Sequence, residues 1–169
     1  MKKNIKELLP FIIAVIVVVL VKLFIFSPVR VTGPSMQPTL HYKDIMILDK
    51  ISYRFTDIER FDIVVVRHQN EFLIKRVIGL PGEEVEYIDN TLYINGKEVK
   101  EQFKHAATDD FNLKRAMGKQ VVPKNNYFVL GDNRIDSLDS RAIGFISRDQ
   151  IQGKANFTIL PLSRWGRKE

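Results

Sequence analysis

A long apolar run near the N-terminus constrains the fold of this chain more than any other feature. Residues 8–26 are apolar apart from Pro10 and Lys22. As a helix, these 19 residues would be about 28 Å long at 1.5 Å per residue, close to the roughly 30 Å hydrocarbon core of a bilayer. Pro10 would lie near the first turn, where its missing N–H is tolerated, and Lys22 could extend its ammonium group to the interface. We therefore expect residues 8–26 to form a transmembrane anchor helix.

Flanking charges indicate the orientation of this helix. Three lysines lie among the first six residues, whereas only Arg30 and Lys43 follow the run within a short distance. Because positive charge is retained on the cytoplasmic side, we expect residues 1–7 in the cytoplasm and residues 27–169 in an extracytoplasmic domain. A cleavable secretory signal is the alternative, but its apolar region would span only about 7 to 15 residues and end in an A-x-A-like site. This run is longer and ends in the letters FIFSP, which favours an uncleaved single-pass anchor in the cell membrane.

Composition excludes several classes of protein. With 45% hydrophobic and 27% charged residues, the chain has the composition of a globular protein. It has no cysteine, which excludes disulfides, thiolate metal sites and a cysteine nucleophile. The net charge of +6 comes from scattered basic residues without an aromatic-basic motif, so we expect no nucleic-acid partner. We expect the charge to attract the domain to anionic lipids of the cytoplasmic membrane or to an acidic envelope.

The rest of the chain predicts an all-β domain, so the expected fold class is mainly β with one N-terminal helix. Short runs of β-branched and aromatic residues alternate with turn residues. The predicted strands cover residues 29–32, 45–49, 63–67, 72–78, 85–88, 91–94, 97–99, 127–130 and 156–159. Turns at residues 89–90 and 95–96, the second of them Asn-Gly, predict a three-stranded meander over residues 85–99. Residues 100–122 show no clear period, and both a surface excursion and a poorly ordered loop remain open.

A short segment after the apolar run contains the candidate nucleophile. Residues 33–40 read GPSMQPTL. Pro34 and Pro38 each fix φ near −65°, and Gly33 permits dihedrals that other residues avoid, so Ser35 is expected on a stiff, irregular turn. Taken alone, the segment is more typical of an ordinary turn than of a catalytic site.

A serine nucleophile needs a base, and lysine fits better than histidine. His41, His68 and His105 are expected to be solvated surface residues. Lys75 lies in the strand predicted over residues 72–78, where it shares a face with apolar neighbours and Arg76 faces the other way. Burial would lower the pKa of Lys75 and make it a general base. The alternative is an edge-strand lysine that guards against aggregation.

A polar segment follows the strand predicted over residues 127–130. Residues 131–145 read GDNRIDSLDSRAIGF, with three acids, two arginines and two serines between glycines. This segment is either a solvated loop or a group of side chains that pair with one another and orient a neighbour.

Three segments, GPSMQPTL, KRVIGLPG and GDNRIDSLDSRAIGF, occur in this order and resemble the signature boxes of the type I bacterial signal peptidases. These are membrane-anchored serine proteases with a Ser-Lys dyad. The single anchor and small domain are similar to the compact Gram-positive members. The resemblance implies a signal-peptidase-like β catalytic domain that cleaves N-terminal signal peptides from exported preproteins at A-x-A-like sites. It implies no cofactor, no metal and no obligate protein partner.

The resemblance also implies roles for individual residues. Ser35 would attack the scissile carbonyl, neutral Lys75 would take the hydroxyl proton, and Ser137 would orient the lysine. Met36 would help to form small pockets for alanine-like side chains. The residues expected to support the site are Asp139, Arg141, Asp132 and Arg134.

One position departs from the Gram-negative pattern. Those members carry a hydroxyl residue two positions before the nucleophile as a second oxyanion donor, and here that residue is Gly33. Pro34 has no N–H, so the Ser35 N–H is the one expected donor. Thr32 or a nearby backbone amide could supply the second.

Two other functions fit the sequence less well. A catalytically inactive, membrane-tethered β module that binds envelope or secreted proteins would be expected to lack Ser35 or Lys75, and both are present. A β-lactamase-like acyl transferase would need a lysine three residues after the serine, where this chain has Pro38.

Overall fold

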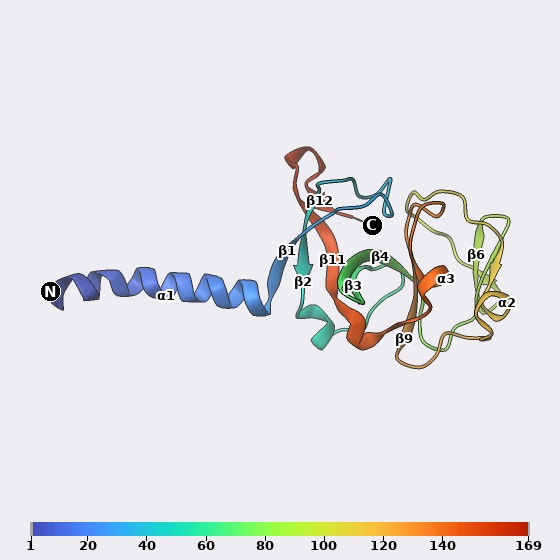
Figure 1. Cartoon of the computed structure of the whole chain (residues 1–169), viewed down its shortest axis with the longest axis horizontal. Coiled ribbons are helices and arrows are strands. Elements are labelled where there is room, and N and C mark those ends of the chain that lie inside the picture. Colours follow the sequence, from blue (N-terminus) through green and yellow to red (C-terminus); the bar gives the residue numbers. More distant parts are fainter. Residues whose placement is uncertain (1, 169) are drawn as a thin grey trace.

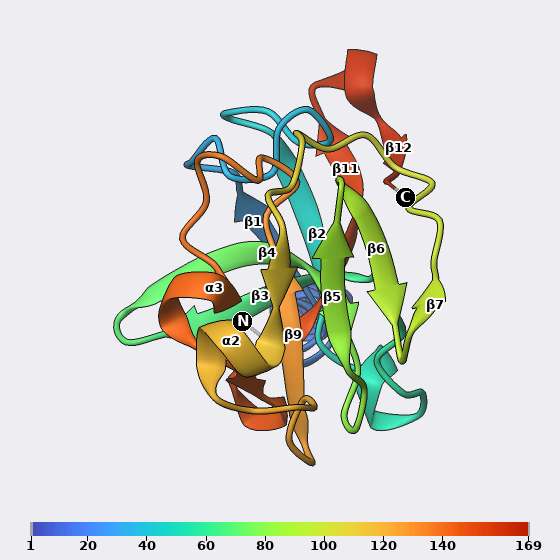
Figure 2. The same cartoon turned by 90° about the vertical axis from the view of Figure 1, so that its right-hand side faces the viewer.

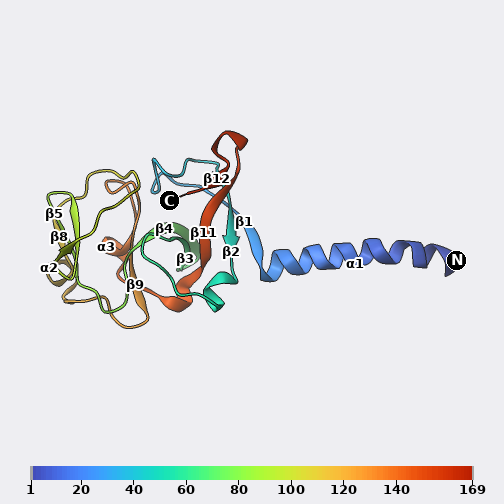
Figure 3. The same cartoon turned by 180° about the vertical axis from the view of Figure 1, so that it is seen from behind.

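One helix extends away from a mainly β domain (Figure 1). The computed structural model describes the backbone of residues 2–168 and the side chains of residues 8–20 and 24–168. The helix is α1 (Lys2–Phe24), and the remainder of the chain folds into strands with a few short helices. Seen from behind, α1 leaves the domain beside β1 (Phe26–Arg30), at the end opposite the smaller of two sheets (Figure 3).

The helix predicted over residues 8–26 is present, but it ends at Phe24, two residues earlier than predicted. Phe26 begins β1 instead, which pairs antiparallel with β2 (Ile45–Asp49) so that Phe26 lies opposite Asp49. Pro28 explains this early end, because the residue before a proline is driven toward extended dihedrals and proline lacks a donor for the helix.

The described part of α1 presents apolar side chains to its surroundings. Between Leu8 and Phe24, each described large apolar side chain of the helix is 47% to 69% exposed. Within residues 8–20 and 24–168, no helix has an apolar stretch long enough to cross a membrane. Two predictions fall on side chains outside the described residues. These are the position of the Lys22 side chain at the interface and the location of residues 1–7 in the cytoplasm.

Two antiparallel sheets form the domain (Figure 2). The larger runs β1-β2-β11-β3-β4-β9-β10, with β12 paired to β11, and the smaller runs β7-β6-β5-β8. The remaining strands of the larger sheet are β3 (Ile63–His68), β4 (Glu71–Gly79), β9 (Asn126–Leu130), β10 (Ile146–Ser147), β11 (Ile151–Leu160) and β12 (Gly166–Arg167). Those of the smaller sheet are β5 (Val85–Ile88), β6 (Thr91–Ile94), β7 (Lys97–Glu98) and β8 (Phe111–Asn112). All nine predicted strands are present, although the first begins three residues earlier than expected and the last begins five residues earlier.

The predicted meander is confirmed in the smaller sheet. β5, β6 and β7 are consecutive neighbours, and Asp89, Asn90, Asn95 and Gly96 all have positive φ at the two turns. Two consecutive positive φ values are the mark of the tight turns that match strand twist.

The segment from residue 100 to residue 122 is an ordered excursion that contains short elements absent from the prediction. It forms β8 and α2 (Leu113–Met117), whose first turn is capped by the Asn112 side chain and whose last turn ends at Gly118 with φ of 66°. Elements of two and five residues are too short to show a hydrophobic period. The other short helices are α3 (Ser140–Ile143) and the 3-10 turns at Ser52–Arg54, Arg148–Gln150 and Leu162–Arg164.

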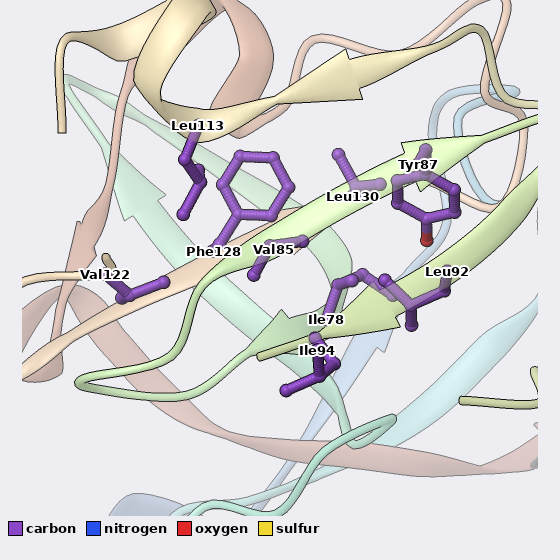
Figure 4. Packing of buried hydrophobic residues seen from close by; sticks show 9 residues of the cluster. All are labelled: Ile78, Val85, Tyr87, Leu92, Ile94, Leu113, Val122, Phe128 and Leu130. Atoms are coloured by element: carbon purple, nitrogen blue, oxygen red, sulfur yellow. The ribbon is translucent and has the colours of Figure 1, made fainter. Parts of the chain in front are cut away.

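A hydrophobic core lies between the two sheets (Figure 4). Strands β5 and β6 contribute Tyr87 and Leu92, which pack with Ile78 of β4 and with Phe128 and Leu130 of β9. β4 is hydrogen-bonded to β3 on one edge and, at its C-terminal half, to β9 on the other. As a result, every residue from Lys75 to Gly79 is buried.

Candidate active site

The turn that carries Ser35 is fastened at its ends and anchored in the core. The Val31 N–H donates to the Asp44 carbonyl at 2.8 Å, which closes the base of the segment. Met36 and Leu40 are 1% and 0% exposed, whereas the neighbouring Ser35 is half-buried. The two buried residues hold the backbone of the turn in place and leave the serine side chain accessible.

Lys75 reaches this turn from the middle of β4. It is 2% exposed, and its Nζ donates a hydrogen bond to Ser35 Oγ at 2.7 Å. The register of β3 and β4 places Lys75 opposite Val64, a fully buried residue. The structure therefore joins the two predicted residues at the end of an apolar cleft.

The surroundings of Lys75 favour its neutral form. Burial lowers the pKa of Lys75 to about 8, because the charged ammonium loses hydration. The nearby carboxylates of Asp139 and Asp132 oppose this shift, and Arg141 adds to it. An amine with this pKa is partly neutral near pH 8, where it can accept a proton.

Arg76, the next residue of β4, lies on the opposite face as predicted, but that face is also buried. The guanidinium group is fully buried and donates to both carboxylate oxygens of Asp132, at 2.8 and 2.7 Å. It also stacks over the Phe103 ring at 3.8 Å from its centre. Asp132 accepts a further hydrogen bond of 2.5 Å from Thr39 Oγ1. This pair connects β4, the nucleophile turn and the segment after β9.

The segment after β9 packs directly on the backbone of Ser35. The Asn133 N–H donates to the Ser35 carbonyl at 3.0 Å. Gly131 lies so close that a Cβ atom there would be 2.3 Å from the Ser35 carbonyl oxygen and 2.2 Å from Ser137 Oγ. The glycine therefore allows Ser137 and the nucleophile turn to approach each other.

Ser137 lies in the expected neighbourhood without the expected hydrogen bond. Its Oγ is buried and has no hydrogen-bond partner among the described residues. The bond to Lys75 that the resemblance implies is thus not formed in this structure. The orienting role of Ser137 stays a prediction.

Asp139 and Arg141 form an ion pair that joins the two ends of the segment after β9, because Asp139 is also bonded to Gly131. Arg141 donates to the two carboxylate oxygens of Asp139 at 2.9 and 2.8 Å, and Asp139 also accepts from the Gly131 N–H at 3.1 Å. Burial alone would raise the pKa of Asp139, but these hydrogen bonds hold it below its ordinary value. A charged Asp139 caps the first turn of α3.

Arg134 connects the same segment to the excursion. It is 3% exposed and donates to Glu101 Oε1 at 2.6 Å, to the Tyr87 hydroxyl at 3.1 Å and to Thr108 Oγ1. The excursion thereby braces the segment that packs on Ser35. Sequence patterns missed Glu101, Tyr87 and Thr108, since nothing local marks them as partners of an arginine more than 20 residues away.

The histidines only partly match expectation. His41 is exposed and His68 is half-buried. The prediction was wrong for His105, whose side chain is 12% exposed and lies 3.2 Å from Glu101. The excursion covers His105, which the sequence could not indicate.

A cleft of about 940 Å³ opens from Ser35 and Lys75 along two strands. One wall is β1 and the residues after it, and the other is the first half of β4. The apolar lining residues include Val29, Val31, Met36, Leu48, Val65, Phe72, Leu73 and Ile74. Within the described part of the chain, β1 and the first half of β4 have no neighbouring strand on the cleft side, so an extended peptide could add its backbone there.

Comparison with known proteins places this site in a family. The family profile described as "Signal peptidase, peptidase S26" matches residues 5–160. The chain is 42% identical over 166 residues to signal peptidase I of Bacillus caldolyticus, covering 92% of this chain and 91% of that protein. It is 45% identical over 152 residues to signal peptidase I V of Bacillus subtilis, covering 84% and 90%.

A solved structure is similar as well. The crystal structure of a signal peptidase I from Enterococcus faecalis V583 aligns with a TM-score of 0.54 at 41% sequence identity, and it covers 59% of this chain and 97% of that one. The family match spans all three sequence segments that carry the resemblance. This chain therefore belongs to the signal peptidase family, peptidase S26.

Proposed function

We propose that this chain is a membrane-bound serine endopeptidase that removes N-terminal signal peptides from exported preproteins at A-x-A-like sites. The observation that carries the proposal is the 2.7 Å contact between Ser35 Oγ and Lys75 Nζ in a place where the lysine is almost fully buried. A hydroxyl and a neutral amine in contact satisfy the requirement of a nucleophile with its base. Relatives named signal peptidase I supply the substrate class.

The reaction would begin with proton transfer across this contact. Neutral Lys75 accepts the Ser35 hydroxyl proton while Oγ forms a bond to the scissile carbonyl carbon. The resulting oxyanion can accept a hydrogen bond from the Ser35 N–H, which has no acceptor among the described residues. The Lys75 ammonium then gives its proton to the leaving amine. Water, activated in turn by neutral Lys75, hydrolyses the acyl-enzyme ester.

Other residues would keep this geometry without reacting. Ser137 would orient Lys75 by a rotation of its hydroxyl, and the buried pairs of Asp132 and Asp139 with their arginines would hold the segment beside Ser35. Met36, which lines the cleft beneath Ser35, would limit the pocket for the residue before the scissile bond to small side chains. Thr32 stays a candidate for the second oxyanion donor.

The same proposal includes an anchor in the cytoplasmic membrane. The part of α1 from residue 8 to Phe24 would lie in the lipid, residues 1–7 would lie in the cytoplasm, and the domain that begins with β1 would lie outside the membrane as the catalytic domain. The continuous exposure of apolar side chains along α1 supports this, because such a surface is stable only in contact with lipid or another apolar partner. Protease protection of intact protoplasts tests it. A C-terminal tag should be digested from outside and an N-terminal tag should be protected, and the reverse pattern would contradict the orientation.

Processing of a preprotein tests the catalytic proposal. Purified full-length protein in detergent is incubated with a preprotein, and the product is identified by N-terminal sequencing. Ser35→Ala and Lys75→Ala should each abolish cleavage without loss of the folded domain, whereas Lys97→Ala, at an exposed lysine of β7, should cleave normally. Substantial processing by either dyad variant would refute the mechanism. Binding of preprotein without cleavage by the wild-type chain would favour the inactive binding module.

A further inference from the structure

The segment beside Ser35 has an inverted polarity. Between Gly131 and Asp139, the charged residues Asp132 and Arg134 are 0% and 3% exposed, while Ile135 and Leu138 are 84% and 50% exposed. Asp136, between these two apolar residues, is the one charged side chain of the segment that faces solvent. Surface segments normally turn charged side chains to water, because burying them costs free energy unless each is paired. Here the paired charges point inward and the apolar side chains point outward. The arrangement creates an exposed apolar surface.

This surface is held in place. Arg134 Nε donates to the Gly131 carbonyl at 3.1 Å, and its terminal nitrogen pairs with Glu101 at 2.6 Å. The Asp136 N–H donates to the side chain and the carbonyl of Asn133, both at 3.2 Å, so the residues around Ile135 form a closed turn. A side chain on a braced turn loses little entropy when it makes a contact.

The surface borders the Ser35 turn but does not line the cleft. The Asn133 N–H is bonded to the Ser35 carbonyl, so the turn that carries Ile135 begins beside the nucleophile. The residues that line the cleft include Ser35 and Lys75 but none from 131 to 139. Ser35 thus lines the cleft and is also bonded to the segment that carries Ile135 and Leu138, which are not part of the cleft.

The connection to α1 indicates which part of a preprotein meets each side. β1 begins two residues after α1 ends (Figure 1), and Ser27 and Pro28 of β1 are among the residues that line the cleft, so the cleft starts close to the end of the helix. A signal peptide that arrives from the same side as α1 would enter the cleft along β1 and reach Ser35 with its last residue. The chain beyond the scissile bond must then leave across the other side.

From this placement we infer that Ile135 and Leu138 contact the first residues of the mature part of the preprotein and favour apolar side chains there. The inference depends on the proposed function, since it assigns a further specificity surface to the same site. Ile135 and Leu138 act through contact with substrate and take no part in proton transfer.

Two preproteins that differ only in the first two mature residues test the inference. One carries Leu-Leu and the other Ser-Ser after the same signal peptide. The wild-type protein should cleave the Leu-Leu substrate with a kcat/KM about fivefold higher, the scale expected for partial burial of two apolar side chains. In the double variant Ile135→Ser, Leu138→Ser this ratio should fall toward one, mainly through KM. The exchange Ile135→Leu, Leu138→Ile should keep the ratio.

The control is Ile88→Ser, which removes a similarly exposed apolar residue at the end of β5 and should leave the ratio unchanged. Thermal unfolding of each variant shows whether the domain remains folded. An unchanged ratio in a folded serine double variant would overturn the inference. If that variant also lost binding to lipid vesicles, the surface would instead be assigned to contact with lipid. Failure of the wild-type protein to cleave either substrate would instead contradict the proposed function.

Discussion

Lys75 Nζ and Ser35 Oγ lie 2.7 Å apart although 40 positions separate the two residues in the chain. Lys75 lies on β4, where it is paired with β3 and stands next to the first residue paired with β9, and Ser35 lies on a turn anchored by two core residues. Lys75 is 2% exposed, so its packing restricts the rotamers that it can adopt. A base held in this way loses little entropy when it takes up the proton.

The rate of cleavage should rise with pH through the pKa of Lys75. Burial lowers this pKa to about 8, and the neutral amine is the active form, so kcat/KM should increase about tenfold per pH unit below 8 and level off above it. The measurement is kcat/KM against a fixed preprotein from pH 6 to pH 10. A flat profile between pH 6 and pH 8 would exclude Lys75 as the base. Lys75→His should shift any residual profile toward acid.

Removal of the buried amine should stabilise the fold while it abolishes activity. Below pH 8, the folded protein holds a proton on Lys75 at an unfavourable pKa of about 8, whereas in the unfolded chain the pKa returns to 10.5. Lys75→Met should therefore raise the free energy of unfolding at pH 6 by on the order of 3 kcal/mol.

The sign of the effect can be checked through its pH dependence. Between pH 8 and 10.5 the unfolded wild-type chain binds more protons than the folded one, so wild-type stability rises with pH and the advantage of the methionine variant shrinks. Urea unfolding at pH 6 and pH 10 measures both values. A methionine variant that is less stable than wild type at pH 6 would show that the charged lysine is well compensated.

Gly131 should tolerate no side chain. An added Cβ would meet the Ser35 carbonyl oxygen at 2.3 Å and Ser137 Oγ at 2.2 Å, so Gly131→Ala must displace the nucleophile turn or the segment beside it. We expect a loss of about 2 kcal/mol or more in stability and a fall in kcat of at least about tenfold. Gly33→Ala is the matched control, since a Cβ there has no atom within 4 Å. Equal effects at the two glycines would show that the close packing is not what matters.

Breaking the buried pair of Arg76 and Asp132 should lower the free energy of unfolding more than breaking a pair nearer the surface. Asp132→Ala leaves a fully buried guanidinium without its carboxylate and should cost about 3–5 kcal/mol. Glu83→Ala breaks the partly exposed pair with Arg60 and should cost about 1 kcal/mol. Denaturant unfolding of both variants gives the comparison, and a loss at Asp132 no larger than that at Glu83 would contradict it.

Local features of the fold were predictable because they depend on neighbours in the chain. The turns at Asn90 and Gly96 need positive φ, which their residue types supply. The alternating burial of Leu92 and Ile94 with half-exposed Tyr93 follows from the period of two in a strand. The burial of Lys75 was predicted from the same period, although not the burial of Arg76 on the other face.

The remaining features depend on contacts that no local pattern records. Arg76 is buried because Asp132 and Phe103 come from segments far along the chain. The pairing of Ser35 with Lys75 was suggested by the need of a serine nucleophile for a base, but only the resemblance to a family favoured it over an edge-strand lysine. The early end of α1 reflects the pairing of β1 with β2, a gain that competes with the apolar run. Glu101 had no sequence signal, because its role exists only once Arg134 lies beside it.

The short junction between α1 and β1 has a consequence for substrate choice. Only Ile25 separates the two elements, and its carbonyl accepts a hydrogen bond from the Lys50 N–H at 2.9 Å, so the helix end is tied to the sheet. With α1 seated in a bilayer as proposed, Ser35 would stand at a fixed height above the lipid. The enzyme would then select preproteins by the length of the spacer between the apolar segment and the scissile bond. A preprotein whose spacer is too short to reach Ser35 would escape cleavage, whatever residues flank that bond.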